Sequence, residues 1–147
     1  MDFKAESFPL YTLLLENKEA GVDAAIRAFE LAQKGGDAEK YNFALGLQTV
    51  AYEIYAPGQT AEINRETLKA CLAVFEEQAE RHAPSALMAA YNRLCGFGCE
   101  IDKAAARKWL DKAEALGGKS EIIDAMRVQA AEPPKKKGLL GKFKPKF

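Results

Sequence analysis

The stretch "LCGFGCEIDKAAARKWLDKAEALGG", residues 94–118, places two glycines around one phenylalanine, and an aspartate and a helical run follow. Such a glycine pair occurs in loops that cradle a phosphate and in tight bends between packed helices. A Walker-type loop needs a lysine and then a serine or threonine after its second glycine, and no such pair follows Gly98. A dinucleotide fingerprint needs a third glycine where this chain has Ile101. The stretch therefore predicts a bend between two helices.

The residue types around this bend are those that two closely packed helices require. Glycines accept positive φ, so the backbone can reverse without a Cβ clash. Asp102 is expected to cap the incoming helix by accepting from its free N–H groups. Trp109 is expected to fill the gap between the helices, where small alanines allow a close approach.

The rest of the chain up to residue 132 has mostly helical patterns. Apolar residues three and four apart, with glycine and proline breaks between them, predict helices over 23–34, 41–55, 84–94, 102–116 and 120–131. A further helix is expected to run from Asn64, as its N-cap, to about Arg81, and Ser120 is expected to cap the last helix. Val50, Tyr52 and Ile54 also alternate as in a strand, but their neighbours are helical and no partner strand is evident.

The spacing of seven residues resembles that of the Sel1-like repeat: Gly96, Gly98, Asp102, Ala106, Trp109, Ala113 and Gly117. The resemblance implies that these seven positions are structural. This repeat is related to the tetratricopeptide repeat, and each unit is a pair of antiparallel helices. The match is best over residues 86–118 and looser over 20–118. The first helix of the best unit departs from the family pattern. Ala89 and Ala90 replace its Leu-Gly pair, Arg93 replaces its tyrosine, and Cys99 replaces its loop valine.

The resemblance implies an all-α fold, namely a short α-solenoid of about three degenerate antiparallel helix pairs with a closing helix. Phe29, Phe75 and Trp109 fall at comparable places in the second helices of these pairs. We expect the helical repeat domain to span residues 1–132. A flexible lysine-rich tail is expected at 133–147.

Composition and cysteine content favour a cytoplasmic protein. The chain has 147 residues, 48% of them hydrophobic and 29% charged, and no apolar run is long enough to span a membrane. The beginning of the chain lacks the pattern of a secretory signal. Cys71, Cys95 and Cys99 cannot all pair within one chain, which favours a reducing compartment and small core residues. Cys95 and Cys99 supply only two of the four ligands of a closed zinc site, so no metal or cofactor is expected.

The chain shows no arrangement that is typical of an enzyme. Its single histidine, His82, falls near a predicted helix end, where a positive charge offsets the helix dipole. A nearby charged stretch is expected to be a solvated helix face: Glu76, Glu77, Glu80 and Arg81. No paired acid and base or nucleophile elbow is present in the sequence, so no catalytic site is expected.

The resemblance also implies a surface for another protein or peptide, because the first helix of each Sel1-like pair lines the inner face of the solenoid. The outward positions that this suggests are Gln48, Met88, Tyr91, Asn92 and Arg93. Tyrosine and arginine are typical interface anchors, although Met88 and Tyr91 could equally pack between units. The leading hypothesis is a protein–protein interaction scaffold or adaptor, with its oligomeric state left open. Bacterial Sel1-like proteins are linked to signalling, envelope processes and interbacterial competition.

The tail, "PPKKKGLLGKFKPKF" at residues 133–147, holds six lysines and no acid, so the remaining residues carry a formal charge of −6. Its expected contact residues are Lys135, Lys136, Lys137, Lys142, Phe143, Lys144, Lys146 and Phe147. It could contact anionic lipid at the inner membrane surface, dock on a protein, or be a solubilising end that folds back on the acidic body. Nucleic acid is disfavoured, because the body would repel phosphate. The alternative functions are therefore a peripheral membrane module and an immunity-type protein that binds a toxin.

Overall fold

A computed structural model of the chain describes residues 3–18, 21–53 and 59–131. Within these ranges it contains seven α-helices, one short 3-10 helix and no strand, which confirms the all-α prediction. The helices are η1 (Ala5–Ser7), α1 (Pro9–Asn17), α2 (Val22–Lys34), α3 (Asp37–Glu53), α4 (Gln59–Gln78), α5 (Ala83–Cys95), α6 (Lys103–Ala115) and α7 (Ser120–Ala130). Val50, whose alternating pattern is ambiguous in the sequence, lies in α3.

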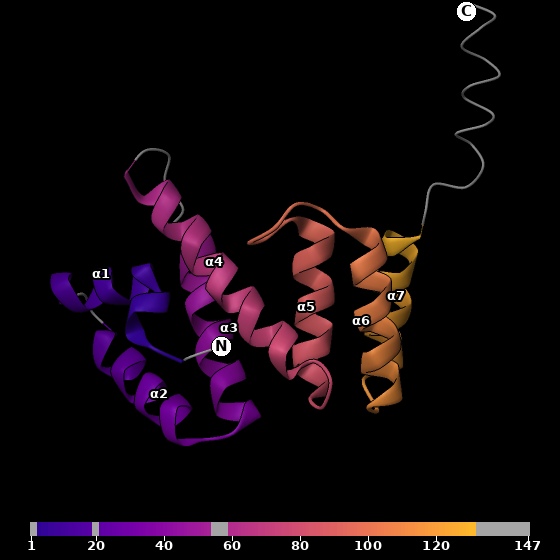
Figure 1. Ribbon diagram of the computed structural model, residues 1–147, viewed down its shortest axis with the longest axis horizontal. Helices are drawn as coiled ribbons and strands as arrows, with labels where there is room; N and C mark the ends of the chain where they lie inside the picture. Colours follow the sequence, from indigo (N-terminus) through magenta and orange to yellow (C-terminus); the bar gives the residue numbers. More distant parts are fainter. Residues whose placement is uncertain (1–2, 19–20, 54–58, 132–147) are drawn as a thin grey trace, which may run out of the picture.

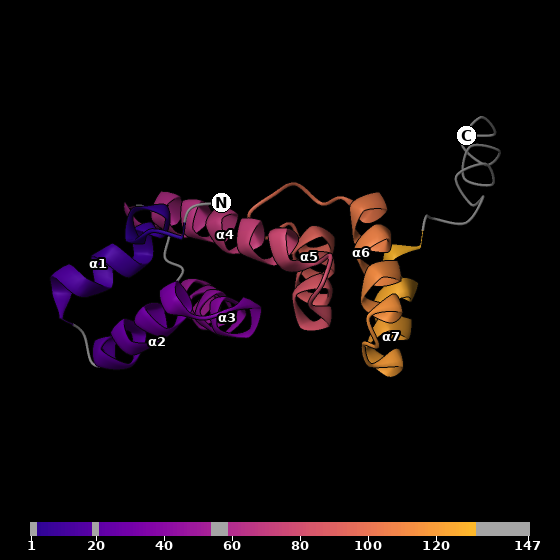
Figure 2. The ribbon, with the colours of Figure 1, turned by 60° about the horizontal axis from the view of Figure 1, so that its bottom comes forward.

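The helices follow the chain order along the longest axis of the molecule, with α1 and α2 at one end and α6 and α7 at the other (Figure 1). Each helix packs against the next one in the chain, while α1 also packs against α4, and α7 against α5. Figure 2, from another side, also shows α6 and α7 next to each other. The core is therefore continuous through the stack rather than confined to one pair of helices.

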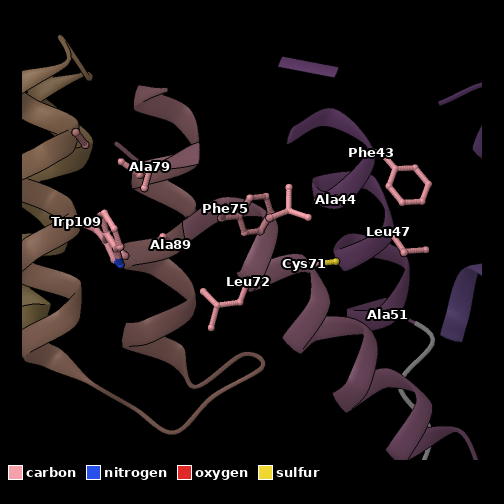
Figure 3. Packing of buried hydrophobic residues seen from close by; sticks show 14 of the residues in the cluster. Phe43, Ala44, Leu47, Ala51, Cys71, Leu72, Phe75, Ala79, Ala89 and Trp109 are labelled. Carbon is pink, nitrogen blue, oxygen red and sulfur yellow. The ribbon is translucent and has the colours of Figure 1, made fainter. Parts of the chain in front are cut away.

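The core between α3 and α6 is built around the apolar face of α4. Leu72 and Phe75 of α4 lie between Leu47 of α3 on one side and Ala89 and Trp109 on the other (Figure 3). All five side chains are buried, as the sequence predicts for Trp109. Burial of a large apolar side chain contributes about 1.5–3 kcal/mol, so this layer is a major source of stability.

A cluster of aromatic rings holds the N-terminal end together. The cluster consists of Phe3, Phe8, Tyr11, Phe29 and Phe43, and the centroids of its neighbouring rings lie 4.8 to 5.5 Å apart. They come from the N-terminal segment, α1, α2 and α3. The sequence patterns do not predict α1, and this cluster supplies the tertiary contacts that make such a short helix stable.

Two predicted N-caps are wrong. α4 begins at Gln59, so Asn64 lies inside the helix, fully buried, and neither its amide nitrogen nor its amide oxygen has a hydrogen-bond partner. Ser120 is the first residue of α7, whose N-cap is Lys119, and no side chain makes a capping hydrogen bond there. Both residue types favour caps, but the chain before each of them decides where the helix begins.

The predicted bend is confirmed between α5 and α6. Gly96 and Gly98 have φ angles of 76° and 78°, in the left-handed region that favours glycine. A Cβ at Gly98 would lie 2.4 Å from the carbonyl oxygen of Leu68, so the bend lies directly against α4. Asp102 is the N-cap of α6, as predicted, and its Oδ1 accepts a hydrogen bond from the backbone N–H of Ala105 at 3.0 Å.

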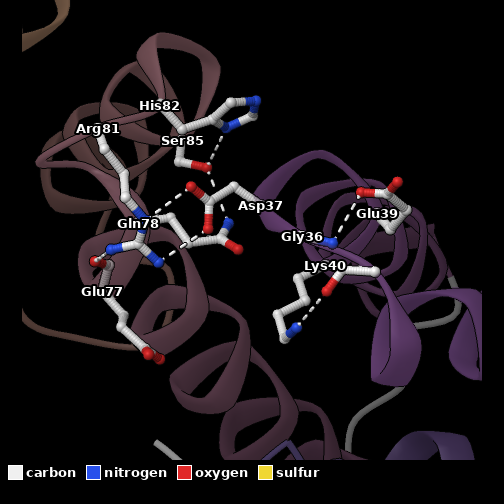
Figure 4. Close-up of polar contacts among 10 residues, drawn as sticks. Gly36, Asp37, Glu39, Lys40, Glu77, Gln78, Arg81, His82 and Ser85 are labelled. Carbon is white, nitrogen blue, oxygen red and sulfur yellow. Dashed lines mark hydrogen bonds and ion pairs between the residues drawn. The ribbon is translucent and has the colours of Figure 1, made fainter.

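Polar contacts fix the turn between α4 and α5 (Figure 4). Arg81 donates two hydrogen bonds, of 2.7 and 2.8 Å, to Asp37 at the start of α3. Gln78 donates to the Ser85 hydroxyl at 3.0 Å, and His82 Nδ1 lies 2.7 Å from the same oxygen. His82 is the N-cap residue of α5 and its backbone N–H donates to the Gln78 carbonyl, so it lies at a helix end as predicted. This is the N-terminal end of α5, however, where a positive charge does not offset the dipole of that helix.

Candidate interaction surface

Two of the five residues predicted to face outward are buried. Gln48 of α3 is 5% exposed and Asn92 of α5 is fully buried. Their side-chain amides exchange two hydrogen bonds, of 2.9 and 2.8 Å, between the two helices. Because each amide satisfies the other, burial leaves no polar group of this pair unpaired. The predicted outward placement of Gln48 and Asn92 is therefore wrong.

We expect Asn92→Leu to lower the free energy of unfolding by about 2 kcal/mol, because it leaves the Gln48 amide buried without its partner. Urea unfolding followed by circular dichroism measures this change. The double variant Gln48→Leu with Asn92→Leu removes both polar groups and should be less destabilised than Asn92→Leu alone. Equal losses in the single and double variants would contradict a paired amide bridge.

Arg93 is half-buried, and its guanidinium is bound to a side chain of a neighbouring helix. Its guanidinium donates two hydrogen bonds, each 2.9 Å long, to the carboxylate of Glu76. The same carboxylate accepts from Trp109 Nε1 at 3.0 Å, so one acid joins α4, α5 and α6. The hydrogen bond to Glu76 raises the pKa of Arg93 above its usual value. Glu76 is therefore not part of a solvated face, although Glu77, Glu80 and Arg81 are exposed as predicted.

The other two predicted contact residues, Met88 and Tyr91, also reach the surface. Met88 is half-buried against the core and Tyr91 is 37% exposed. Pro84 and Cys95, both exposed, share their face of α5, because the four positions are spaced by four, three and four residues. We refer to Pro84, Met88, Tyr91 and Cys95 as the α5 stripe.

The α5 stripe differs from an ordinary solvated helix face because it carries no charge. Arg93, already bound to Glu76, is the single charged residue among the thirteen of α5. α6 also has thirteen residues, and six of them are charged: Lys103, Arg107, Lys108, Asp111, Lys112 and Glu114. Exposed helix faces usually carry charged and polar side chains. The low number of charged residues in α5 compared with α6 is visible in the sequence and would have indicated α5 as the unusual helix.

The glycine bend extends the apolar surface beyond the end of the α5 stripe. The Phe97 ring lies 5.9 Å from the Tyr91 ring, centroid to centroid. Ile101, at the other end of the bend, is 63% exposed, and a Cβ at Gly96 would lie 3.2 Å from its Cγ1. The bend that reverses the chain therefore also adds apolar side chains to the surface.

A second feature, which the sequence patterns do not reveal, is an apolar cavity of about 260 Å³ between α1, α2 and α3. Its lining includes Leu14, Ala25, Gly46 and Val50. Among the lining residues, Asn42 is the one with a polar side chain. We call this hollow the α1–α3 cavity.

The three cysteines differ in their surroundings. Cys71 is fully buried, as a small core residue should be, and this burial raises the pKa of its thiol. Burial also raises the pKa of the half-buried Cys99, against the opposing effect of Arg93. Cys95 is exposed, so the expectation of a core position is wrong for it. The described part of the chain contains no group of three or more histidine, cysteine or acidic residues that could hold a metal.

The eight predicted contact residues of the tail lie outside the described residues. Within the described residues, no helix combines the length and the apolar character needed to cross a bilayer.

Comparisons of the chain with protein-family models, with curated proteins and with solved structures found no match.

Proposed function

We propose that this chain is a Sel1-like helical repeat protein that binds another protein or peptide through the α5 stripe, as a small adaptor. The observation that carries the proposal is the accessible, charge-free face of α5 around Met88 and Tyr91. Interface cores are depleted in charged residues, and tyrosine, tryptophan, phenylalanine, methionine and arginine are enriched in interfaces. An exposed helix face of this composition is a better candidate for contact with a partner than for contact with water alone.

The repeat assignment is supported by the role that each matching residue has in the α5–α6 unit. The glycines at 96, 98 and 117 have φ angles between 76° and 86°, and Asp102 caps α6. Ala106 and Ala113 are fully buried and Trp109 is 7% exposed. These are the roles that a pair of closely packed helices gives to the residue types of the Sel1-like pattern.

The surroundings of the α5 stripe favour an apolar or aromatic group of the partner over an acidic one. An acidic group would have to compete with Glu76 for Arg93, and the loss of that pair would leave a half-buried carboxylate with fewer donors. Tyr91 instead offers an aromatic face with little conformational entropy to lose. Arg93 is accordingly a residue that positions α5 and not an anchor for the partner.

Affinity capture from cells of the source organism, with Tyr91→Asp as the test variant, examines this proposal. Val128→Asp is the matched control, because Val128 is 78% exposed on α7 and the change adds the same charge away from the stripe. We expect a partner, identified by mass spectrometry, to be retained by the wild type and by Val128→Asp, but at least about tenfold less by Tyr91→Asp. Thermal melts establish that both variants are folded. Equal retention by both variants would remove the α5 stripe as the contact surface.

A further inference from the structure

Charge is distributed unevenly along the chain. Residues 1–80 hold fourteen acidic and seven basic side chains, a formal charge of −7, whereas residues 133–147 hold six lysines and no acid. α1 and α2 lie at one end of the longest axis, and α6 and α7 lie at the other (Figure 1). The tail follows α7 in the sequence. The acidic part of one copy is thus complementary in charge to the tail of another copy.

The α1–α3 cavity lies in this acidic part of the molecule and is large enough for an apolar side chain. Its volume is about 260 Å³, whereas an apolar cavity of about 150 Å³ holds a benzene ring in another protein. Gly46 leaves it open, because a Cβ built at this residue would meet nothing within 4 Å. Besides its lysines, the tail holds four large apolar residues: Leu139, Leu140, Phe143 and Phe147.

We propose that the tail, residues 133–147, of one copy docks in the α1–α3 cavity of a second copy. An apolar side chain of the tail enters the cavity, and the lysines lie against the acidic residues of the α1–α4 half. Because the two contact regions are different, the interaction is head-to-tail and builds either a closed ring or an open chain of copies. Neither region includes the α5 stripe, so an experiment that refutes this self-association does not refute the adaptor function, and the reverse also holds.

The test uses the full chain and a fluorescein-labelled peptide of residues 133–147. Gly46→Leu fills the cavity, while Ala38→Leu adds the same side chain to an exposed part of α3 outside the cavity lining. We expect the peptide to bind the wild type and Ala38→Leu in fluorescence anisotropy, and to bind Gly46→Leu at least about tenfold more weakly. High salt should weaken binding, because the lysines contribute through charge. Equal binding to Gly46→Leu, or no binding at low salt, overturns the proposal.

Sedimentation equilibrium of the full chain examines the intermolecular part. We expect association that increases with concentration in the wild type and is lost in the double variant Phe143→Ser with Phe147→Ser, which leaves the described body unchanged. A chain that stays monomeric at every concentration overturns docking on a second copy, even where the free peptide binds. Co-sedimentation of the chain with vesicles of phosphatidylcholine and phosphatidylglycerol tests lipid as the alternative partner of the tail. If the chain binds these vesicles, Gly46→Leu leaves that binding unaltered and the peptide does not bind the chain, then the tail binds lipid and the docking proposal is overturned.

Discussion

Trp109→Ala is expected to lower the free energy of unfolding by about 3–5 kcal/mol, the range typical of a large aromatic side chain removed from a packed core. The indole is 7% exposed and lies in the layer between α4, α5 and α6. Its removal leaves a cavity beside Ala89 and deprives Glu76 of the hydrogen bond from Nε1. Urea unfolding measures the change, with far-UV circular dichroism as the signal because the variant has no tryptophan.

Trp109→Phe is the matched control for the indole hydrogen bond. It keeps an aromatic ring in the layer but loses the donor to Glu76, which still accepts both hydrogen bonds of Arg93. The loss for this variant is expected to be about 1–2 kcal/mol. An unfolding midpoint for Trp109→Ala equal to that of the wild type would show that this layer does not stabilise the fold.

The features that the sequence predicts well are local ones. Glycine pairs, an N-cap aspartate and proline in a first turn act on their own backbone or on residues within one turn, so Gly96, Gly98, Asp102 and Pro84 could be placed without tertiary information. The helical periodicity of α2 and α6 likewise identified their buried faces, because Phe29 and Trp109 are too large to leave exposed without cost.

The predictions that failed depend on residues far apart in the chain. Gln48 and Asn92 are buried because each finds the other across 44 positions, and no local pattern shows such a partner. In the sequence, Glu76 resembles the surface acids next to it. In the structure its carboxylate accepts hydrogen bonds from Arg93 and Trp109, which are 17 and 33 positions away. The sequence therefore identified the outward face of α5 only in part. The two α5 residues that do not belong to it, Asn92 and Arg93, are those whose side chains bind polar groups of other helices.

The two surface features had unequal chances of being found from the sequence. The α5 stripe has a sequence signal, because α5 is nearly free of charge beside a highly charged α6. The α1–α3 cavity has none. Small residues such as Ala25 and Gly46 allow two helices to pack closely, but they leave an empty space where the helices stay apart. The position of α1 determines which of these two outcomes occurs, and the sequence does not show it.

Gly98→Ala is expected to cost about 3 kcal/mol or more of stability, the larger part from steric overlap. A left-handed residue other than glycine costs roughly 1–2 kcal/mol, and Gly98 has a φ of 78°. In addition, the new Cβ would lie 2.4 Å from the Leu68 carbonyl oxygen and 2.7 Å from the Lys69 nitrogen. Both are backbone atoms inside α4, so neither can move aside as a flexible side chain could.

Gly117→Ala separates these two contributions. Gly117 has a similar φ of 86°, but a Cβ there would meet nothing within 4 Å, so this variant should lose only the roughly 1–2 kcal/mol of left-handed strain. The difference between the two variants in urea unfolding then measures how firmly the bend is held against α4. Because Phe97 lies in that bend and contacts Tyr91, the same difference also tests whether the end of the α5 stripe is fixed in place. Equal losses would mean that the bend can move away from α4, and that this end of the surface is adjustable rather than preorganised.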